Sequence, residues 1–337
     1  MKIAVLAGGF SYERDVSMMS GTLVSNALMS LGHEVALCDV CRPVFSQPHA
    51  KFTKNTILEY SIPESPPDPH EMKNGSPDGN LIGSGVIELC RSADLAFVAL
   101  HGGMGEDGRI QAVLESFGIA FTGSSFGACC LSMDKYVSKA ICQREGIPTM
   151  PSVLYKKGER LPSVKYPAVI KPRSCGSSIG VSFVFNEEEL RSALDNAFLY
   201  EEHVLIEEKA EGREFSVSVL GGRALPSVEI VPHGDMYDFK HKYQPGKTDE
   251  ICPSSLSPEE EKEIGRLALS AHNALGLSDY SRSDFIYDKK RNEFIYLETN
   301  ALPGLTRQSL LPLSAGAAGI SYEALCDMIC KLALERK

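Results

Sequence analysis

The sequence predicts an α/β protein with a mostly parallel sheet in its first domain. Short apolar runs at residues 2–7, 34–37 and 95–100 have the pattern of buried strands, and apolar residues at helical spacing separate the first two. Glycine-rich polar loops follow the first and third runs. Alternating strands and helices favour a parallel sheet, with ligand loops at the carboxyl ends of its strands. At 337 residues the chain is long enough for two or three domains.

The composition indicates a globular protein without nucleic-acid or membrane partners. Apolar residues make up 43% and charged residues 23%, close to the globular average, so a sizeable core is expected. The net charge of -10 and the lack of a Lys/Arg-rich stripe argue against a nucleic-acid-binding protein. The N-terminal apolar run is too short for a signal peptide or a membrane span, and no later run is long enough. We therefore expect a cytoplasmic protein.

The ten cysteines are expected to be reduced thiols in such a protein. Cys38 and Cys41 form one CxxC pair, but no second pair or nearby histidine completes a zinc-ligand pattern. Thiols of a strand and a loop are the better interpretation.

Spacing and breaking residues define the elements of the first domain. Two glycines end the first strand, and apolar residues at positions 16–31 then recur at helical spacing. Residues 42–85 are rich in Pro, Ser and Asn and are interpreted mostly as a surface insertion. The loop of residues 101–108 precedes a helix that starts near Arg109.

The remainder of the chain predicts two further units, which begin near Ser124 and Gly212. The first is expected to contain a helix at 132–144, strands at 168–171, 180–185 and 204–207, and a helix after Asn186. The second is expected to contain strands at 214–220, 284–287 and 293–297 and a helix at 258–275. No internal repeat is present.

The most informative stretch is a pair of apolar strands joined by a polar turn, which predicts an antiparallel hairpin. If the turn is centred on Arg291, Asp284 faces Glu298 and Arg282 faces Asn300. Because side chains alternate along a strand, these four polar groups then converge at one end of the hairpin.

The converging groups suit a metal ion and a developing negative charge. Asp284, Glu298 and Asn300 offer two carboxylates and an amide oxygen, which are hard ligands of the kind that Mg²⁺ prefers. Arg282 beside them would stabilise negative charge on a reacting group. A hairpin end with ordinary surface charges is the alternative. The convergence of four such residues ahead of the unusual segment 301–310 favours the site.

The Gly/Ser loop of residues 171–180 lies between two predicted strands and lacks the Gly-Lys-Ser/Thr ending of a P-loop. Such a turn can fold over phosphates with its N–H groups and hydroxyls, while Lys171 supplies a charge. A flexible hairpin explains these residues equally well in isolation. Lys135, on the preceding helix, is a candidate second phosphate cation, although a lone helical lysine is usually solvated.

The loop after the first strand contains Glu13 at the start of a helix. It is not a GxGxxG loop, and no clear acidic ribose partner follows the second strand, so dinucleotide binding is disfavoured. A carboxylate at a helix start ordinarily caps the helix and interacts with its dipole. The functional alternative is that Glu13 holds the ammonium group of an amino-acid substrate.

Five short motifs occur in one order along the chain: ERDVS (13–17), HGGMGEDG (101–108), SMDK (132–135), KPRSCGSSIG (171–180) and ETNALPG (298–304). This series resembles the D-alanine–D-alanine ligase family of ATP-grasp enzymes over essentially the whole chain. The individual motifs are short, but their joint order and spacing are specific.

The resemblance implies a three-domain ATP-grasp architecture, α/β in a Rossmann-like first domain and α+β in the ATP-grasp part. The implied domains are residues 1–123 with the Pro-rich insertion at about 42–85, a central ATP-grasp subdomain at 124–211, and a C-terminal subdomain with the metal site at 212–337.

The resemblance also implies where ATP lies, between the central and C-terminal subdomains. Lys135 and Lys171 would contact its phosphates, and the Gly/Ser loop with Ser177 and Ser178 would close over them. Other implied nucleotide residues are Glu207, Glu208, Ala210, Glu214 and Lys242, with Glu207 and Glu214 at the ribose. The implied ligands of two Mg²⁺ or Mn²⁺ ions are Asp284, Glu298 and Asn300.

The implied chemistry is ligation of two D-alanines through an acylphosphate. Glu13 would bind the first ammonium group with the help of Ser177 and Tyr243. Other implied roles are stabilisation of the oxyanion by Arg282 and the N–H of Gly304, substrate binding by His101, and binding of the second carboxylate by Ser309 and Leu310.

Departures from the family pattern leave the second substrate open. Cys175 stands where an acidic residue is common, and Phe239, Ala301, Arg307 and Gln308 also differ. A D-serine or D-lactate ligase is therefore an alternative, although Lys242-Tyr243 matches dipeptide-forming members better. A non-catalytic nucleotide-binding regulator is a further alternative, and the retained site charges argue against it. The resemblance implies a homodimer.

Overall fold

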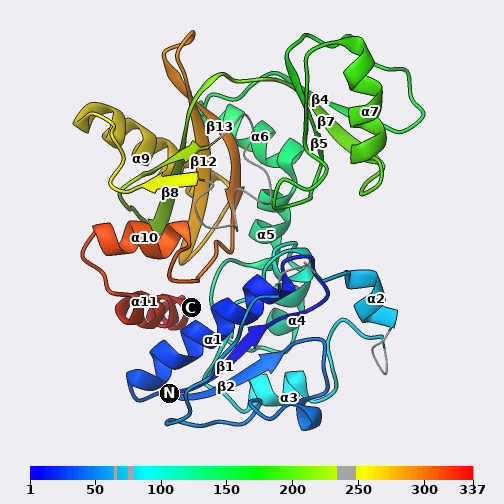
Figure 1. Ribbon diagram of the computed structural model, residues 1–337. Helices are drawn as coiled ribbons and strands as arrows, with labels where there is room; N and C mark the ends of the chain where they lie inside the picture. The colour runs from blue at the N-terminus through cyan, green and yellow to red at the C-terminus, as the bar shows by residue number, and fades with distance from the viewer. Residues whose placement is uncertain (64–66, 75–78, 234–247, 337) are drawn as a thin grey trace.

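The computed structural model describes residues 1–63, 67–74, 79–233 and 248–336. Within these residues the strands form three sheets, one each in the N-terminal, central and C-terminal parts of the chain (Figure 1). In the view of Figure 1 the N-terminal sheet lies at the bottom, the central sheet at the upper right and the C-terminal sheet at the upper left. The mixed helix and sheet architecture agrees with the predicted fold class.

The first sheet has three parallel strands in the order β2-β1-β3, which confirms the prediction of a parallel sheet. Its strands are β1 (Lys2–Ala7), β2 (Glu34–Asp39) and β3 (Leu95–Val98). The accompanying helices are α1 (Arg14–Ser30), α3 (Val86–Arg91) and α4 (Arg109–Ser116), with the 3-10 turn η2 (Gly103–Gly105) before α4. The strands are almost wholly buried, as continuous apolar runs predict.

The insertion after β2 packs along α1 over part of its length. It contains η1 (Val44–Ser46) and α2 (Pro69–Asn74). Leu58 is buried, and its backbone N–H and C=O both bond the side-chain amide of Asn26, at 2.9 Å each. The hydroxyl of Tyr60 donates to the carboxylate of Asp15 in the first turn of α1. The insertion therefore contacts the end of α1 that carries Glu13.

The second sheet is antiparallel, with the order β4-β7-β5-β6. Its elements are β4 (Ser152–Lys156), β5 (Ala168–Pro172), β6 (Ser182–Val184), β7 (His203–Glu208) and α7 (Glu187–Ala197). The helix begins after Asn186 as predicted, because the Asn186 side chain accepts the N–H of Glu189 at 3.0 Å. Strand β4 was not predicted.

The helix predicted at residues 132–144 is present, but it begins at Lys135 rather than at Ser132. Two helices, α5 (Phe126–Met133) and α6 (Lys135–Arg144), meet at Asp134, whose backbone is extended. The Asp134 carboxylate accepts the N–H groups of Tyr136 and Val137, both at 3.1 Å. Asp134 thus caps α6, and this break makes Lys135 the first residue of the helix.

The third sheet is antiparallel, with the order β11-β10-β8-β12-β13 and β9 paired to β8. Its strands are β8 (Gly212–Leu220), β9 (Arg223–Ala224), β10 (Val228–Pro232), β11 (Thr248–Ile251), β12 (Tyr280–Asp288) and β13 (Glu293–Asn300). The helices are α9 (Pro258–Ala274), α10 (Leu310–Ala317) and α11 (Tyr322–Glu335). A capping box between Ser257 and Glu260 starts α9 where the sequence predicts it.

The last helix, α11, packs against α1 rather than against the sheet that precedes it (Figure 1). Leu325, Cys326 and Ile329 of α11 are fully buried in the same apolar core as the strands β1 and β3. The core of the N-terminal sheet therefore contains both ends of the chain.

All ten cysteines are free thiols, as expected, and Cys38 and Cys41 are buried. None of the described helices combines the length and apolar character that crossing a bilayer requires.

The packing of α1 on the first sheet depends on Gly21. A Cβ atom there would lie 2.6 Å from the Cβ of Ala7 and 3.0 Å from Cδ1 of Leu37. We expect Gly21→Ala to lower the free energy of unfolding by about 1–3 kcal/mol, because the helix must move away from the sheet.

Gly127 of α5 is the matched control, since nothing lies within 4 Å of a Cβ built there. Gly127→Ala should raise the free energy of unfolding by about 0.5–1 kcal/mol. Urea denaturation of both variants measures the difference, and equal effects would contradict the tight α1–β1 contact.

Candidate active site

The hairpin of β12 and β13 has the predicted pairs at its open end. Asp284 is the partner of Glu298, and Arg282 is the partner of Asn300. Nearer the turn, however, the register is shifted by one, because a bulge follows Asp284 and leaves Leu297 without a partner in the ladder. The turn is therefore not centred on Arg291, and the bulge restores the pairing expected at the site.

Arg282 and Asp284 form a two-pronged ion pair on β12. Nε and one terminal nitrogen of Arg282 lie 2.9 Å from the two carboxylate oxygens of Asp284. Ser216, on the neighbouring strand β8, donates its hydroxyl to the same carboxylate at 2.7 Å. Both side chains are largely buried, so this geometry is held firmly at the end of the hairpin.

Glu298 contacts Lys135, the first residue of α6. Lys135 Nζ lies 2.9 Å from Glu298 Oε2 and donates to the carbonyl oxygen of Cys175, in the Gly/Ser loop, at 2.8 Å. Lys135 is buried rather than solvated. Burial alone would lower the pKa of Lys135, but the Glu298 carboxylate raises it above its ordinary value. One lysine thus joins the C-terminal hairpin to the Gly/Ser loop.

The other end of the Gly/Ser loop contacts the N-terminal domain. The hydroxyl of Ser177 donates to Oε1 of Glu13, the contact expected from the resemblance. Ser177 and Ser178 have φ angles of 51° and 57°, in the left-handed region, which turns the loop sharply toward α1. Glu13 is buried at the N-terminus of α1.

The loop after β3 also lies against the Glu13 side chain. A side chain at Gly102 would meet Glu13 Oε2 at 2.8 Å, so glycine is needed there. Glu106 is buried and accepts the N–H of Gly102 at 2.9 Å. Burial and the nearby Glu13 raise the pKa of the Glu106 carboxyl to about 8. Glu106 belongs to a motif that the sequence singled out, but no role was predicted for it.

His101 is buried beside the same carboxylates. Its Nε2 lies 3.0 Å from the hydroxyl of Ser20 on α1. Burial lowers the pKa of His101 despite the nearby Glu13, which favours a neutral imidazole.

The strand β2 does end in an acidic residue, Asp39, which the sequence reasoning did not recognise. Its carboxylate accepts hydrogen bonds from a terminal nitrogen of Arg14 at 2.5 Å and from the N–H of Gly9 at 3.1 Å. Because these groups occupy it, Asp39 holds the glycine loop and α1 together, and dinucleotide binding stays disfavoured.

Glu207, predicted at the ribose, is buried between two lysines. Its oxygens lie 2.6 Å from Lys139 Nζ and 2.6 Å from Lys171 Nζ. Burial alone would raise the pKa of Glu207, but the two lysines hold it below its usual value. Lys139 was missed in the sequence, although it lies four residues after Lys135 and therefore on the same helix face.

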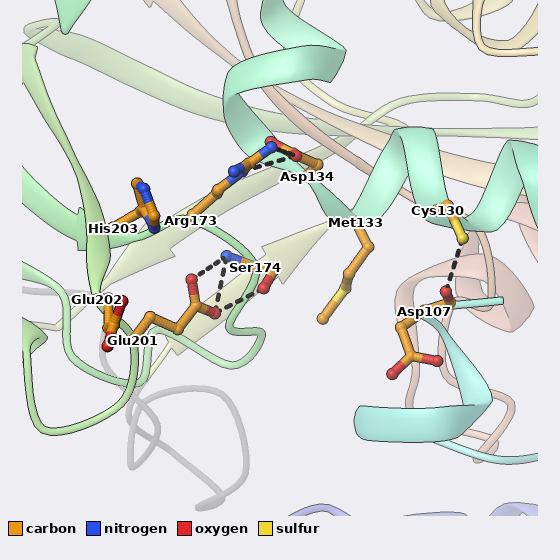
Figure 2. A pocket seen from close by; sticks show the side chains of 9 residues that line it. All are labelled: Asp107, Cys130, Met133, Asp134, Arg173, Ser174, Glu201, Glu202 and His203. Carbon is orange, nitrogen blue, oxygen red and sulfur yellow. Dashed lines mark hydrogen bonds and ion pairs between the residues drawn. The ribbon is translucent and has the colours of Figure 1, made fainter. Parts of the chain in front are cut away.

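The start of the Gly/Ser loop is anchored from two sides (Figure 2). Arg173 Nε donates to Asp134, the cap of α6, at 2.7 Å. Ser174 donates its N–H and its hydroxyl to the carboxylate of Glu201, the hydroxyl at 2.6 Å, and the Cys175 thiol contacts the same carboxylate at 3.4 Å. Asp134, Arg173, Ser174 and Glu201 line a pocket of about 470 Å³ whose full lining is Asp107, Cys130, Met133, Asp134, Arg173, Ser174, Glu201, Glu202 and His203. None of the predicted site residues lines it.

The segment after β13 leads into the N-terminus of α10. A side chain at Gly304 would meet the hydroxyl of Ser309 at 2.7 Å, so the Ser309 side chain lies close to the backbone of Gly304. Ser309 is the N-cap of α10 and Leu310 its first residue, which places backbone N–H groups at a helix start that favours a carboxylate. Arg307 pairs with Glu323 of α11 at 2.7 Å.

The donor set at the hairpin end suits a hard cation when phosphate is also present. Among the residues that the structure describes, no three His, Cys, Asp or Glu side chains are grouped to hold a metal. Asp284 and Glu298 face each other, and Asn300 adds an amide oxygen that accepts the N–H of Leu302 at 2.7 Å and keeps a second lone pair. Mg²⁺ takes one or two carboxylates and fills its other positions with water or phosphate oxygens, so these residues fit it.

The remaining predicted residues fall into two groups. Glu208, Ala210 and Glu214 lie on β7, in the following turn and on β8, and the Glu208 side chain pairs with Lys165 at 2.9 Å. Lys242 and Tyr243 lie outside the described residues.

Comparison with known proteins gives a consistent result. Two family profiles match the chain, "D-ala D-ala ligase N-terminus" over residues 2–124 and "D-ala D-ala ligase C-terminus" over residues 141–331. The chain is 39% identical to the D-alanine–D-alanine ligase of Pediococcus pentosaceus over 98% of this chain and 96% of the relative. It is 37% identical to the D-alanine–D-alanine ligase of Lacticaseibacillus casei over 96% of this chain and 92% of that relative.

A solved structure is similar over the same extent. The crystal structure of D-alanine–D-alanine ligase from Bacillus anthracis complexed with ATP has a TM-score of 0.77 at 31% identity, covering 99% of this chain and 98% of that chain.

The anchor at Glu201 can be tested without any substrate. We expect Glu201→Ala to speed amide hydrogen exchange in residues 173–180 by roughly 5- to 30-fold, because the loop loses hydrogen bonds to a charged acceptor. Glu202→Ala, which removes the exposed carboxylate next in the chain, is the control and should leave exchange in the loop unchanged. Equal exchange in the two variants would show that Glu201 does not hold the loop.

Proposed function

Because the chain belongs to the D-alanine–D-alanine ligase family, we propose that it uses ATP to join two D-alanines into D-alanyl-D-alanine, releasing ADP and phosphate. The dipeptide would serve as a building block of peptidoglycan. Full-length similarity to relatives of that name supports the proposal, as does similarity to a structure complexed with ATP.

One observation in the structure carries the proposal, a continuous series of contacts between the two ends of the site. Glu13 bonds Ser177 of the Gly/Ser loop, the loop carbonyl of Cys175 bonds Lys135, and Lys135 pairs with Glu298 of the hairpin. The residues proposed for the amino-acid ammonium group, for the phosphates and for the metal are therefore next to one another. Joining a carboxylate to an amine through phosphoryl transfer needs these three parts together.

The first step activates a carboxylate. Glu13, fixed by Ser177, holds the ammonium group of the first D-alanine. The carboxylate of that D-alanine attacks the γ-phosphorus of ATP, the bond to the β-phosphate breaks, ADP leaves, and an acylphosphate forms. Lys135 and Lys171 stabilise the phosphate charge as it moves. Asp284, Glu298 and Asn300 would hold Mg²⁺ or Mn²⁺, which supplies neutralisation of the phosphate oxygens. In the structure Asp284 pairs with Arg282 and Glu298 pairs with Lys135.

The second step forms the peptide bond. The N-terminus of α10, at Ser309 and Leu310, receives the carboxylate of the second D-alanine and aims its amine at the acylphosphate. Arg282 and the N–H of Gly304 stabilise the oxyanion of the tetrahedral intermediate, while buried His101 lines the substrate side. Phosphate then leaves.

The nucleotide lies between the central and C-terminal subdomains. The backbone of Glu208 and Ala210 binds adenine, and Glu214 binds the ribose. Glu207 is less suited to the ribose than the sequence suggested, since both of its oxygens contact lysines. The proposed assembly is a homodimer, as the family resemblance implies. The proposed location is the cytoplasm, which is supported by cysteines that are all free thiols.

The proposed reaction is tested by measuring phosphate release from ATP with D-alanine alone, and then with D-serine or D-lactate added, followed by product analysis. We expect D-alanyl-D-alanine as the main product. A mixed product as the main species would overturn the choice of second substrate, and no turnover with any D-amino acid would overturn the ligase proposal.

The metal role of Glu298 gives a second prediction. Glu298→Gln should lower turnover by at least about a hundredfold, because an amide cannot neutralise a metal or Lys135 as a carboxylate does. Glu293→Gln, on the same strand and half exposed, should retain wild-type turnover. Both variants should keep the wild-type circular dichroism spectrum, and wild-type turnover in Glu298→Gln would refute the role.

A further inference from the structure

A second buried lysine, Lys139, lies one helical turn after Lys135 on α6. It is only 3% exposed, and its Nζ lies 2.6 Å from Oε1 of Glu207 and 3.1 Å from the carbonyl oxygen of Tyr296 on β13. Lys171 approaches the other oxygen of Glu207 at 2.6 Å. Lys139 therefore contacts the central sheet through Glu207 on β7 and the C-terminal sheet through Tyr296 on β13. Figure 1 shows α6 between these two sheets.

Among the described residues, the ion pairs of this junction contain more cations than anions. Three cations, Lys135, Lys139 and Lys171, contact two anions, Glu207 and Glu298, at distances of 2.6–2.9 Å. Lysine and glutamate are rarely buried unless they are paired, and an unbalanced buried charge is costly. An anionic ligand next to Lys171 would offset the surplus positive charge.

We propose that Lys139 is a positioning residue of the nucleotide site, which neutralises Glu207 so that the positive charge of Lys171 remains available to a phosphate. The inference rests on the proposed function, since it takes Lys171 as a phosphate-binding cation. An ammonium group has three donors, so Lys171 keeps its contact with Glu207 and still reaches a phosphate oxygen. Without Lys139, Glu207 and Lys171 form a neutral pair whose buried carboxylate repels the phosphate.

The protonation states agree with this arrangement. Burial lowers the pKa of Lys139 to about 8, with Glu207 opposing the shift, so the ammonium form predominates at neutral pH. The pKa of Glu207 is below its usual value because both lysines face it. The carboxylate thus carries a full negative charge that one lysine alone would have to balance.

A purely structural ion pair makes a different prediction. Removing one partner of an isolated buried pair leaves an unpaired charge and is strongly destabilising. Lys139→Met leaves no unpaired charge, because Glu207 keeps Lys171. The fold should therefore persist, and the change should appear in nucleotide affinity.

We expect Lys139→Met to bind the non-hydrolysable analogue AMP-PNP with Mg²⁺ on the order of tenfold to a hundredfold more weakly than the wild type, because one buried charge near the phosphates is lost. Isothermal titration calorimetry without D-alanine measures this independently of ligation. Arg144→Met, which removes a positive charge from the exposed end of α6, is the matched control and should bind like the wild type.

The double variant Lys139→Met/Glu207→Gln distinguishes positioning from direct contact. It removes both charges and leaves Lys171 alone, so affinity should return to within about threefold of the wild type through coupling of the two changes. A double variant as weak as Lys139→Met would overturn the inference, as would wild-type affinity in Lys139→Met.

If Lys139→Met fails to fold, the double variant alone tests the inference. An AMP-PNP affinity near that of the wild type in the double variant supports it, and a tenfold loss of affinity overturns it. A wild-type protein that does not bind AMP-PNP would overturn the proposed nucleotide site itself. The other outcomes leave the ligase proposal standing.

Discussion

The ion pair between Lys135 and Glu298 determines how the parts of the site meet. It joins α6 to the end of β13, and the same ammonium group holds the Gly/Ser loop through the carbonyl of Cys175. Because Lys135 is buried, loss of Glu298 would leave the ammonium charge of Lys135 in a region that water hardly reaches. These contacts of Lys135 hold the loop, helix and hairpin relative to one another.

The position of Lys135 depends in turn on the interruption of the helix at Asp134. In a continuous helix the Lys135 N–H would donate to a carbonyl of the preceding turn. Here that N–H donates instead to the carbonyl of Arg173 at 3.0 Å. Asp134 caps α6 and accepts from the Arg173 side chain. The backbone and side chains at one short break therefore set the distance between the helix and the Gly/Ser loop.

The sequence predicted the parallel N-terminal sheet, the hairpin and the order of the motifs, because apolar periodicity and residue spacing are local properties. Asp134 has the residue type of a helix cap, but the apolar residues on both sides concealed the break. The edge strands β4 and β11 were missed because half-exposed edge strands have weak apolar patterns. The inner strand β10 was missed as well. The predicted pairing of Asp284 with Glu298 is confirmed, although a bulge rather than the assumed turn position produces it. Lys139 and Glu201 act through residues distant in sequence, and only the folded chain shows those partners.

The placement of α11 against α1 affects the order in which the protein is made. Strands β1 and β3 leave the ribosome early, yet their apolar core includes Leu325 and Ile329, near the end of the chain. During synthesis the core around the N-terminal sheet must therefore remain incomplete, with apolar surface exposed, until α11 has emerged. Glu13 sits on the helix that α11 covers, so a chain stopped before α11 lacks the support of its amino-acid site.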